Sequence, residues 1–316
     1  MKRSLQKTKR RNKPLDGQIV ENEPLADKSW FRTGGAARYF YRPTSVEDLS
    51  TFLQGFLQGP LKDIPIMTLG VGSNLIIRDG GFDGLVIRLS KAFSWVEPQE
   101  GGRIKAGAAC MGITLANAAR DAGIGGLEFL SGVPGTLGGA VRMNAGAYGC
   151  EMADCMIDCR VMDRSGKIRT LKRDALGYRY RSSDLGDDQI IIDLSLQGQI
   201  DDPKTISSRL EAIAQTREQS QPLRTRTGGS TFKNPSGKKA WELIDAAGCR
   251  GMTRGGAQVS EKHCNFLINT KDATSADLEG LGEDVRRRVR AVTGIDLVWE
   301  IRRIGSSLDD GDEGDA

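Results

Sequence analysis

Residues 131–149, SGVPGTLGGAVRMNAGAYG, are the stretch from which the fold of this chain can be predicted. Glycine occurs there too often for the interior of a helix or a strand, so we predict a loop. Glycine has no Cβ and tolerates positive φ, so such a loop can bring backbone N–H groups against an anionic group such as a phosphate. The apolar residues Val133, Leu137 and Val141 between the glycines argue against a solvated linker. The stretch is therefore expected to hold a large, phosphate-bearing ligand.

A second glycine cluster, GVGSN at 70–74, follows a short apolar run at 64–69 that is typical of a strand. A strand that ends in a tight polar turn can bind phosphate. The third glycine of GxGxxG is missing here, and GxxxxGK[ST] occurs nowhere in the chain. Neither an ordinary Rossmann domain nor a P-loop is supported.

Length and composition fit a chain of two or three domains that is large enough to be an enzyme. The 316 residues, 38% of them hydrophobic, can build two or three domains with substantial cores. No apolar run of about eighteen residues occurs, and no signal-peptide core follows the basic N-terminus, so we expect a cytoplasmic protein without membrane insertion. Both charged ends are predicted to be disordered tails. The basic one has no aromatic residue for base stacking, so nucleic-acid binding is not expected.

The cysteines and the single histidine give little support for a metal site. Cys150, Cys155 and Cys159 follow C-x4-C-x3-C, which matches neither zinc pairs nor the common iron–sulfur spacings. With His263 as the one histidine, a Ser-His-Asp triad is not supported either. No metal is predicted, and proton transfer is expected to use another residue type.

Hydrophobic spacing predicts alternating strands and helices along the chain. A capping box from Thr44 to Glu47 opens the first helix. Strands at 75–78 and 85–89 are predicted to pair across the turn at 79–81. Later elements are strands at 103–107, 157–163, 167–171, 189–196 and 265–269, and helices at 113–122, 205–219, 240–247 and 276–292.

A glutamate stands in the middle of the closing strand, 295–304. Alternation places Glu300 on the face opposite Leu297. Two interpretations are open: a solvated face paired with Arg302 or Arg303, or a carboxyl group aimed into a site, with a raised pKa if it is desolvated.

Several motifs in a fixed order resemble the UDP-N-acetylenolpyruvoylglucosamine reductase family. The resemblance spans about 30–305 and depends on the ordered set rather than on any one motif. Its parts are RTGG at 32–35, GVGSN at 70–74, the 131–149 stretch, YRSS at 180–183 on a YRxS pattern, GSTFKNP at 229–235, HCNFLIN at 263–269, and the late glutamate.

The resemblance implies an α+β protein with the two-lobed FAD-binding fold of vanillyl-alcohol oxidase, or PCMH-type, proteins and a C-terminal α/β substrate-binding domain. No long insertion precedes GSTFKNP, which resembles the shorter type II subgroup. The expected parts are a disordered basic tail at 1–29, FAD-binding lobes at 30–92 and 93–222, a substrate-binding domain at 223–305, and a disordered acidic tail at 306–316.

The family's reaction is the NADPH-dependent reduction of the enolpyruvyl ether on UDP-N-acetylglucosamine to UDP-N-acetylmuramate, for peptidoglycan synthesis. FAD would carry the hydride, and NADPH would supply it. By resemblance, the residues that contact FAD are Gly70, Gly72, Ser73, Asn74, Ser131, Gly135, Thr136, Gly138, Gly139, Asn144, Gly146 and Ala147.

Three residues match the family's catalytic positions. Arg181 would stabilise the charge that develops beside the substrate carboxylate, Glu300 would act with it, and Ser230 would deliver the proton as general acid. Arg181 fits YRxS better than Arg179 does, although both follow a tyrosine. Ser230 could instead be a turn or cap residue.

The substrate would be a strongly anionic sugar nucleotide. Asn234 matches a substrate-binding asparagine of the family, and Tyr148 is a candidate for covering the UDP group. Basic residues surround the serine motif and suit the diphosphate, each with ordinary surface charge as its alternative: Arg224, Arg226, Lys233, Lys238 and Lys239.

Two other functions are considered. Another FAD-linked oxidase or dehydrogenase of the same fold would keep the glycine loops without needing GSTFKNP, YRxS and the late glutamate together. A nucleotide- or nucleic-acid-binding protein would use the basic arm, and its glycine loops would be structural.

Overall fold

A parallel arrangement of three strands at the centre of the first lobe sets the position of the 70–74 turn. The computed structural model describes residues 17–308. In the first sheet, parallel pairs join β5 to both neighbours, and an antiparallel strand adds to one edge. The strand order is β1 (Ile19–Pro24), β2 (Ala36–Tyr41), β5 (Phe82–Ile87) and β3 (Ile66–Thr68).

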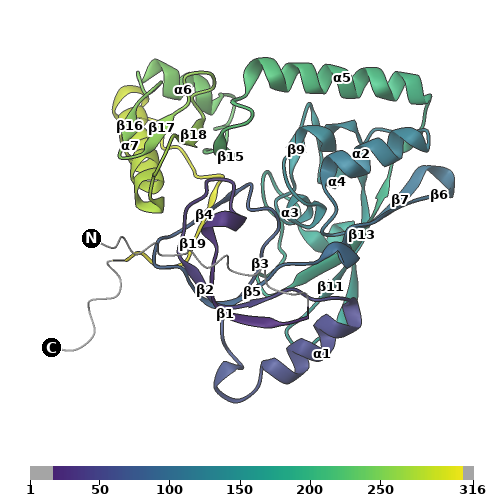
Figure 1. The fold of residues 1–316 in the computed structure, drawn as a ribbon. Helices are drawn as coiled ribbons and strands as arrows, with labels where there is room; N and C mark the ends of the chain where they lie inside the picture. The colour runs from purple at the N-terminus through teal and green to yellow at the C-terminus, as the bar shows by residue number, and fades with distance from the viewer. Residues whose placement is uncertain (1–16, 309–316) are drawn as a thin grey trace, which may run out of the picture.

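Helix α1 (Val46–Phe56) covers one face of this sheet (Figure 1). Leu49 and Leu53 are fully buried, and the ring of Tyr41 stacks on Phe52 with 3.6 Å between centroids. The helix is capped by Ser45, whose side chain accepts the Asp48 N–H. The predicted capping box from Thr44 was therefore one residue early.

The second lobe is a five-stranded antiparallel sheet with helices on one side. The predicted hairpin of 157–163 with 167–171 is confirmed. The strand order is β12 (Ile168–Lys172), β11 (Met156–Met162), β13 (Ile190–Gln197), β7 (Arg103–Gly107) and β6 (Val96–Gln99). The helices are α2 (Gly112–Asp121), α3 (Leu137–Arg142) and α4 (Met152–Cys155), and the short strands are β8 (Ile124–Gly125), β9 (Gly146–Ala147), β10 (Cys150–Glu151) and β14 (Gln199–Ile200).

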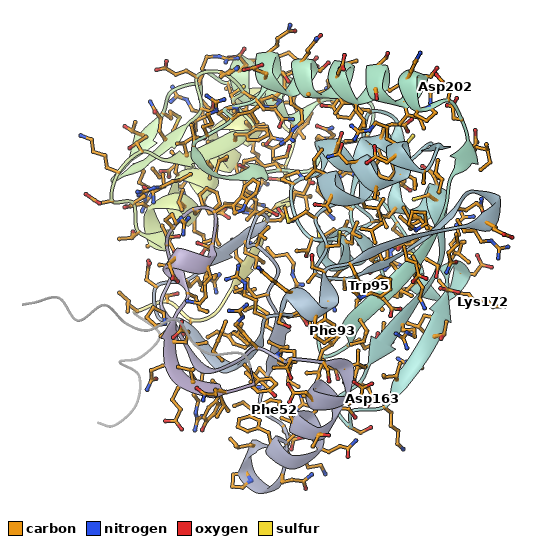
Figure 2. The ribbon with its side chains drawn as sticks, turned by 45° about the vertical axis from the view of Figure 1, so that its right-hand side comes forward. Phe52, Phe93, Trp95, Asp163, Lys172 and Asp202 are labelled. Carbon is orange, nitrogen blue, oxygen red and sulfur yellow. The ribbon has the colours of Figure 1, made fainter. Side chains whose placement is uncertain are left out.

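The two lobes share a hydrophobic core. Leu49 from α1, Phe93 from the connection between the lobes, and Met162 and Ile190 from the second sheet belong to one buried cluster. Phe93 and Phe52 are labelled in Figure 2. This shared core fixes the 70–74 turn relative to the glycine-rich stretch.

Helix α5 (Pro203–Ser220) runs across the second lobe toward the C-terminal part (Figure 1). That part has the strand order β15 (Arg226–Ser230), β18 (Phe266–Asn269), β17 (Ala257–Val259) and β16 (Thr253–Arg254), with helices α6 (Ala240–Ala246) and α7 (Ser275–Thr293). Its core includes Phe232, Leu267 and Leu281, together with Phe31 from the first lobe.

The end of the described chain returns to the first lobe. Strand β19 (Arg302–Ile304) pairs in parallel with β4 (Leu75–Ile77). The predicted pairing of 75–78 with 85–89 is wrong, because β5 instead lies between β2 and β3. Parallel pairing with a distant strand therefore takes the place of a local hairpin.

Three further expectations need correction. The segment 1–29 was predicted to be disordered, yet β1 pairs along β2 and three of its residues are half-buried. Residues 1–16 lie outside the described part of the chain, as do 309–316 of the expected acidic tail. The 131–149 stretch is not wholly a loop, because α3 forms within it. The closing strand is regular only over β19, although the alternation holds: Leu297 is fully buried.

Candidate active site

A large cavity lies where the two lobes and the C-terminal part meet. Its volume is about 1440 Å³, and its walls include residues of the 70–74 turn, the 131–149 stretch, α5, β15 and residues 295–304, which we call the closing segment. A typical pocket for one small ligand has roughly 300–1,000 Å³. The cavity therefore has room for a large cofactor and a second ligand.

Most of the residues predicted to contact FAD line this cavity. Ser131 and Asn144 do not. The Ser131 hydroxyl donates to the backbone oxygen of Glu128 at 2.8 Å, and the fully buried Asn144 side chain bonds the backbone of Ala153 and Arg179. These two polar side chains therefore stabilise the backbone of the 131–149 stretch and do not face the cavity. The lining residues are Gly70, Gly72, Ser73, Asn74, Gly135, Thr136, Gly138, Gly139, Gly146 and Ala147.

The cavity wall suits an anionic, hydrogen-bonding ligand. Among the described residues, the cations that line it outnumber the acids Glu21, Glu23, Asp27 and Glu300. The buried hydroxyls of Thr68 and Thr227 have no hydrogen-bond partner within the described chain, and both residues line the cavity. Buried polar atoms are normally paired, so these walls fit the phosphates and polar rings of FAD. The cations are Lys28, Arg42, Arg88, Lys91, Arg142, Arg181, Arg217, Arg224 and Arg302.

Arg181 and Glu300 meet in this cavity from distant parts of the sequence. The Arg181 Nε atom donates to Glu300 Oε1 at 3.1 Å, and its NH2 group donates to the backbone oxygen of Gly146 at 2.8 Å. The guanidinium also lies over the Tyr180 ring, 4.9 Å from its centroid. Arg181 has a φ of 54°, a conformation that residues with a side chain rarely adopt. Arg179 instead pairs with Asp184 on the surface.

Burial raises the pKa of the Glu300 carboxyl, because the ionised form loses solvation. The charges of Arg181 and then Lys233 oppose this shift. The side chain is 18% exposed, so of the two interpretations open from the sequence, the desolvated carboxyl holds and the solvated face does not. A guanidinium beside such a carboxyl can bind a carboxylate and stabilise negative charge that develops next to it.

Ser230 ends β15 on the same cavity wall. Gly229 before it has a φ of 74°, which glycine adopts without strain. After it, the Thr231 N–H donates to the backbone oxygen of Asn265 at 2.7 Å, and the Glu300 N–H donates to the Thr231 oxygen at 2.8 Å. Ser230 thus directly precedes Thr231, whose backbone oxygen accepts the hydrogen bond from Glu300.

The three residues predicted to bind substrate differ in position. Asn234 lines the cavity, and its Oδ1 accepts the N–H of Ala240 at the start of α6. Lys233 and Tyr148 do not line it. Lys233 Nζ lies 3.4 Å from the backbone oxygen of Arg181, and the ring of Tyr148, which is 44% exposed, packs beside Gly132. Of the basic cluster around the serine motif, Arg224 alone lines the cavity within the described residues.

Sequence reasoning missed several lining cations. Arg42 and Arg88 directly follow the parallel strands β2 and β5, and the Arg88 N–H donates to the oxygen of Tyr41 at 2.9 Å, which places the two arginines side by side. Ligands commonly bind beyond the carboxyl ends of parallel strands, so their position was a usable signal. Arg217 on α5 gave no such signal.

Within residues 17–308, no three His, Cys, Asp or Glu side chains gather in a way that could hold a metal ion. None of the helices there has the length and apolar character needed to cross a membrane.

Two sequence families match this chain. Residues 37–172 match the FAD binding domain, and residues 221–304 match the C-terminal domain of UDP-N-acetylenolpyruvoylglucosamine reductase. The chain is 56% identical over 291 residues to the UDP-N-acetylenolpyruvoylglucosamine reductase of Erythrobacter litoralis, covering 92% of this chain and 89% of the relative. It is 53% identical to that of Sphingopyxis alaskensis, covering 92% and 96%.

Solved structures agree with these matches. A UDP-N-acetylenolpyruvylglucosamine reductase (MurB) from Thermus caldophilus has a TM-score of 0.77 at 31% identity, over 91% of this chain and 98% of the other. The 6-hydroxy-D-nicotine oxidase of Arthrobacter nicotinovorans has a TM-score of 0.56 at 11% identity, over 92% and 89%, a likeness of fold alone. The predicted two-lobed FAD-binding fold with a C-terminal domain is confirmed. The chain belongs to the UDP-N-acetylenolpyruvoylglucosamine reductase family.

Proposed function

We propose that this flavoenzyme reduces UDP-N-acetylenolpyruvoylglucosamine to UDP-N-acetylmuramate with NADPH as the hydride donor, in the cytoplasmic stage of peptidoglycan precursor synthesis. The observation that carries the proposal is the Arg181–Glu300 pair, 3.1 Å apart, in one cavity with Ser230 and the two glycine segments. The names of the relatives support the substrate.

Bound FAD, once reduced, would supply the hydride that reaches the terminal carbon of the enolpyruvyl group. Negative charge then develops beside the substrate carboxylate. Arg181, held in place by Glu300 and by the oxygen of Gly146, would stabilise that charge without reorganising. The raised pKa of Glu300 favours a neutral carboxyl that can donate a hydrogen bond to the same group.

Ser230 would then deliver a proton to the adjacent carbon. A serine hydroxyl is a weak acid, but a carbanion-like centre is basic enough to take its proton. The fixed backbone around Thr231 would hold the hydroxyl in place while substrate binds.

Two cations that line the cavity near α5 support an anionic sugar nucleotide as the substrate. Arg217 and Arg224 line the cavity near α5, and Arg217 NH1 donates to the oxygen of Ser131 at 3.2 Å. We assign them to the diphosphate, and Asn234 to the sugar nucleotide. Arg42 and Arg88, which follow strands of the first lobe, are assigned to the phosphates of FAD.

The test is the visible spectrum of the purified protein, followed without oxygen as NADPH and then the enolpyruvyl sugar nucleotide are added. We expect flavin bands that bleach with NADPH and return with the substrate. Bands that bleach and do not return would refute the assigned substrate and favour another flavin dehydrogenase. A protein that holds no flavin after reconstitution with FAD would refute the proposal as a whole.

A further inference from the structure

The backbone of Glu300 is held from both sides. Its N–H donates to the oxygen of Thr231 at 2.8 Å, on the strand that carries Ser230. Its C=O accepts a hydrogen bond from the side-chain Nδ2 of Asn74 at 3.2 Å. The backbone of this one residue therefore connects the serine strand to the 70–74 turn.

The turn that carries Asn74 is itself tightly held. The Gly72 oxygen accepts the N–H of Trp30 at 3.1 Å, and the Ser73 hydroxyl donates to the oxygen of Pro134 at 3.0 Å. The backbone oxygen of Asn74 accepts the Arg302 N–H at 3.1 Å, where β4 and β19 begin to pair. Asn74 thus bonds the closing segment through both its side chain and its backbone.

We infer that Asn74 is a positioning residue for Glu300, and not primarily a ligand of the cofactor as the sequence suggested; this rests on the proposed function. Its amide donates to the glutamate's own carbonyl, so it fixes where the side chain leaves the backbone. From that point Glu300 reaches Arg181 at 3.1 Å. Hydrogen bonds of Asn74 therefore fix the turn predicted to hold the cofactor relative to the carboxyl predicted to act on the substrate.

Two substitutions at this position separate the roles. Asn74→Ala removes the donor, and Asn74→Asp keeps the shape but presents a carboxylate oxygen to the Glu300 carbonyl. Asn117→Ala on α2 is the matched control, since this amide bonds Arg120 and does not line the cavity. For each protein we would measure FAD affinity by fluorescence, both flavin half-reactions by rapid-mixing absorbance, and hydrogen exchange over 297–303.

In both Asn74 variants we expect reoxidation of reduced flavin by the enolpyruvyl sugar nucleotide to slow about fivefold to tenfold, as loss of one hydrogen bond predicts. Reduction by NADPH and the Kd for FAD should stay within about twofold of wild type, a smaller change than loss of a cofactor hydrogen bond predicts. The amides of Glu300 and Arg302 should exchange at least about fivefold faster. Asn117→Ala should match wild type throughout.

A Kd for FAD weakened by more than about tenfold, with wild-type reoxidation once FAD is saturating, would make Asn74 a cofactor ligand and overturn the inference. Unchanged hydrogen exchange in both variants would also overturn it. Wild-type flavin that the substrate does not reoxidise would instead count against the proposed function, and the exchange measurement would still decide the role of Asn74.

Discussion

The glycine at position 282 offers a sharp test of how tightly the closing segment is packed. Gly282 lies in the middle of α7, where alanine would normally stabilise a helix by about 0.5–1 kcal/mol. Here a Cβ would stand 2.1 Å from the ring of Trp299. The clash can be relieved only if that ring moves.

The ring is held on several sides. Trp299 Nε1 donates to Glu283 at 2.7 Å, the Arg303 guanidinium lies 4.7 Å from the ring centroid, and the Phe232 ring lies 5.0 Å away. Overpacking a well-filled site costs about 1–3 kcal/mol. Subtracting the helix gain leaves a net destabilisation of up to about 2.5 kcal/mol for Gly282→Ala.

The matched control is Gly55→Ala in α1, where a Cβ would meet nothing within 4 Å. It should stabilise by about 0.5–1 kcal/mol. Differential scanning calorimetry at one heating rate should give a lower Tm for Gly282→Ala, by roughly 2–4 °C per kcal/mol, and a higher Tm for Gly55→Ala. Equal stabilisation by both variants would refute the packing described for Trp299.

Three further outcomes are expected. Ser230→Ala should slow flavin reoxidation by substrate about 100-fold or more and leave reduction by NADPH nearly intact; stopped-flow traces with equal losses in both steps would remove its proton-donor role. Burial raises the folded-state pKa of Glu300 above its ordinary 4.5, so the folded protein holds this proton more tightly than the unfolded chain does. Wild-type stability therefore falls as the pH rises from 4.5 to the folded-state pKa. Glu300→Gln should therefore gain stability relative to wild type as pH rises above 4.5 in urea titrations, and a pH-independent difference would contradict this. The side chain of Arg88 makes no hydrogen bond or ion pair within residues 17–308, and burial and then the charge of Arg42 lower its pKa. Arg88→Gln should weaken FAD affinity about tenfold in a fluorescence titration. An unchanged Kd for FAD would exclude a contact between Arg88 and a phosphate.

Local patterns in the sequence predicted the elements that depend on local chemistry. The 157–171 hairpin and helices α5 and α7 follow from spacing, capping and glycine stops, since neighbouring residues determine them. Glu300 could be singled out because an acid in the middle of a strand is notable, although its role came from the family resemblance.

Other features depend on partners far away in the chain. No local signal shows that β4 pairs with β19, so a hairpin was the simplest and wrong prediction. Asn144 lies in a glycine-rich stretch that faces a cavity, yet its side chain points into the protein, which spacing alone cannot reveal. The cations of the wall come from separate strands and helices, and only the tertiary fold gathers them.

The parallel pair of β4 and β19 also bears on how the chain is made. A ribosome delivers residues in order, and N-terminal units generally fold first. The first lobe can form its main sheet early, but β4 has no strand partner among described residues until 302–304 emerge. The glutamate two residues earlier reaches its place only then. Assembly of the candidate active site is thus among the last events of synthesis, and a nascent chain stalled before β19 should hold its lobes without a complete site.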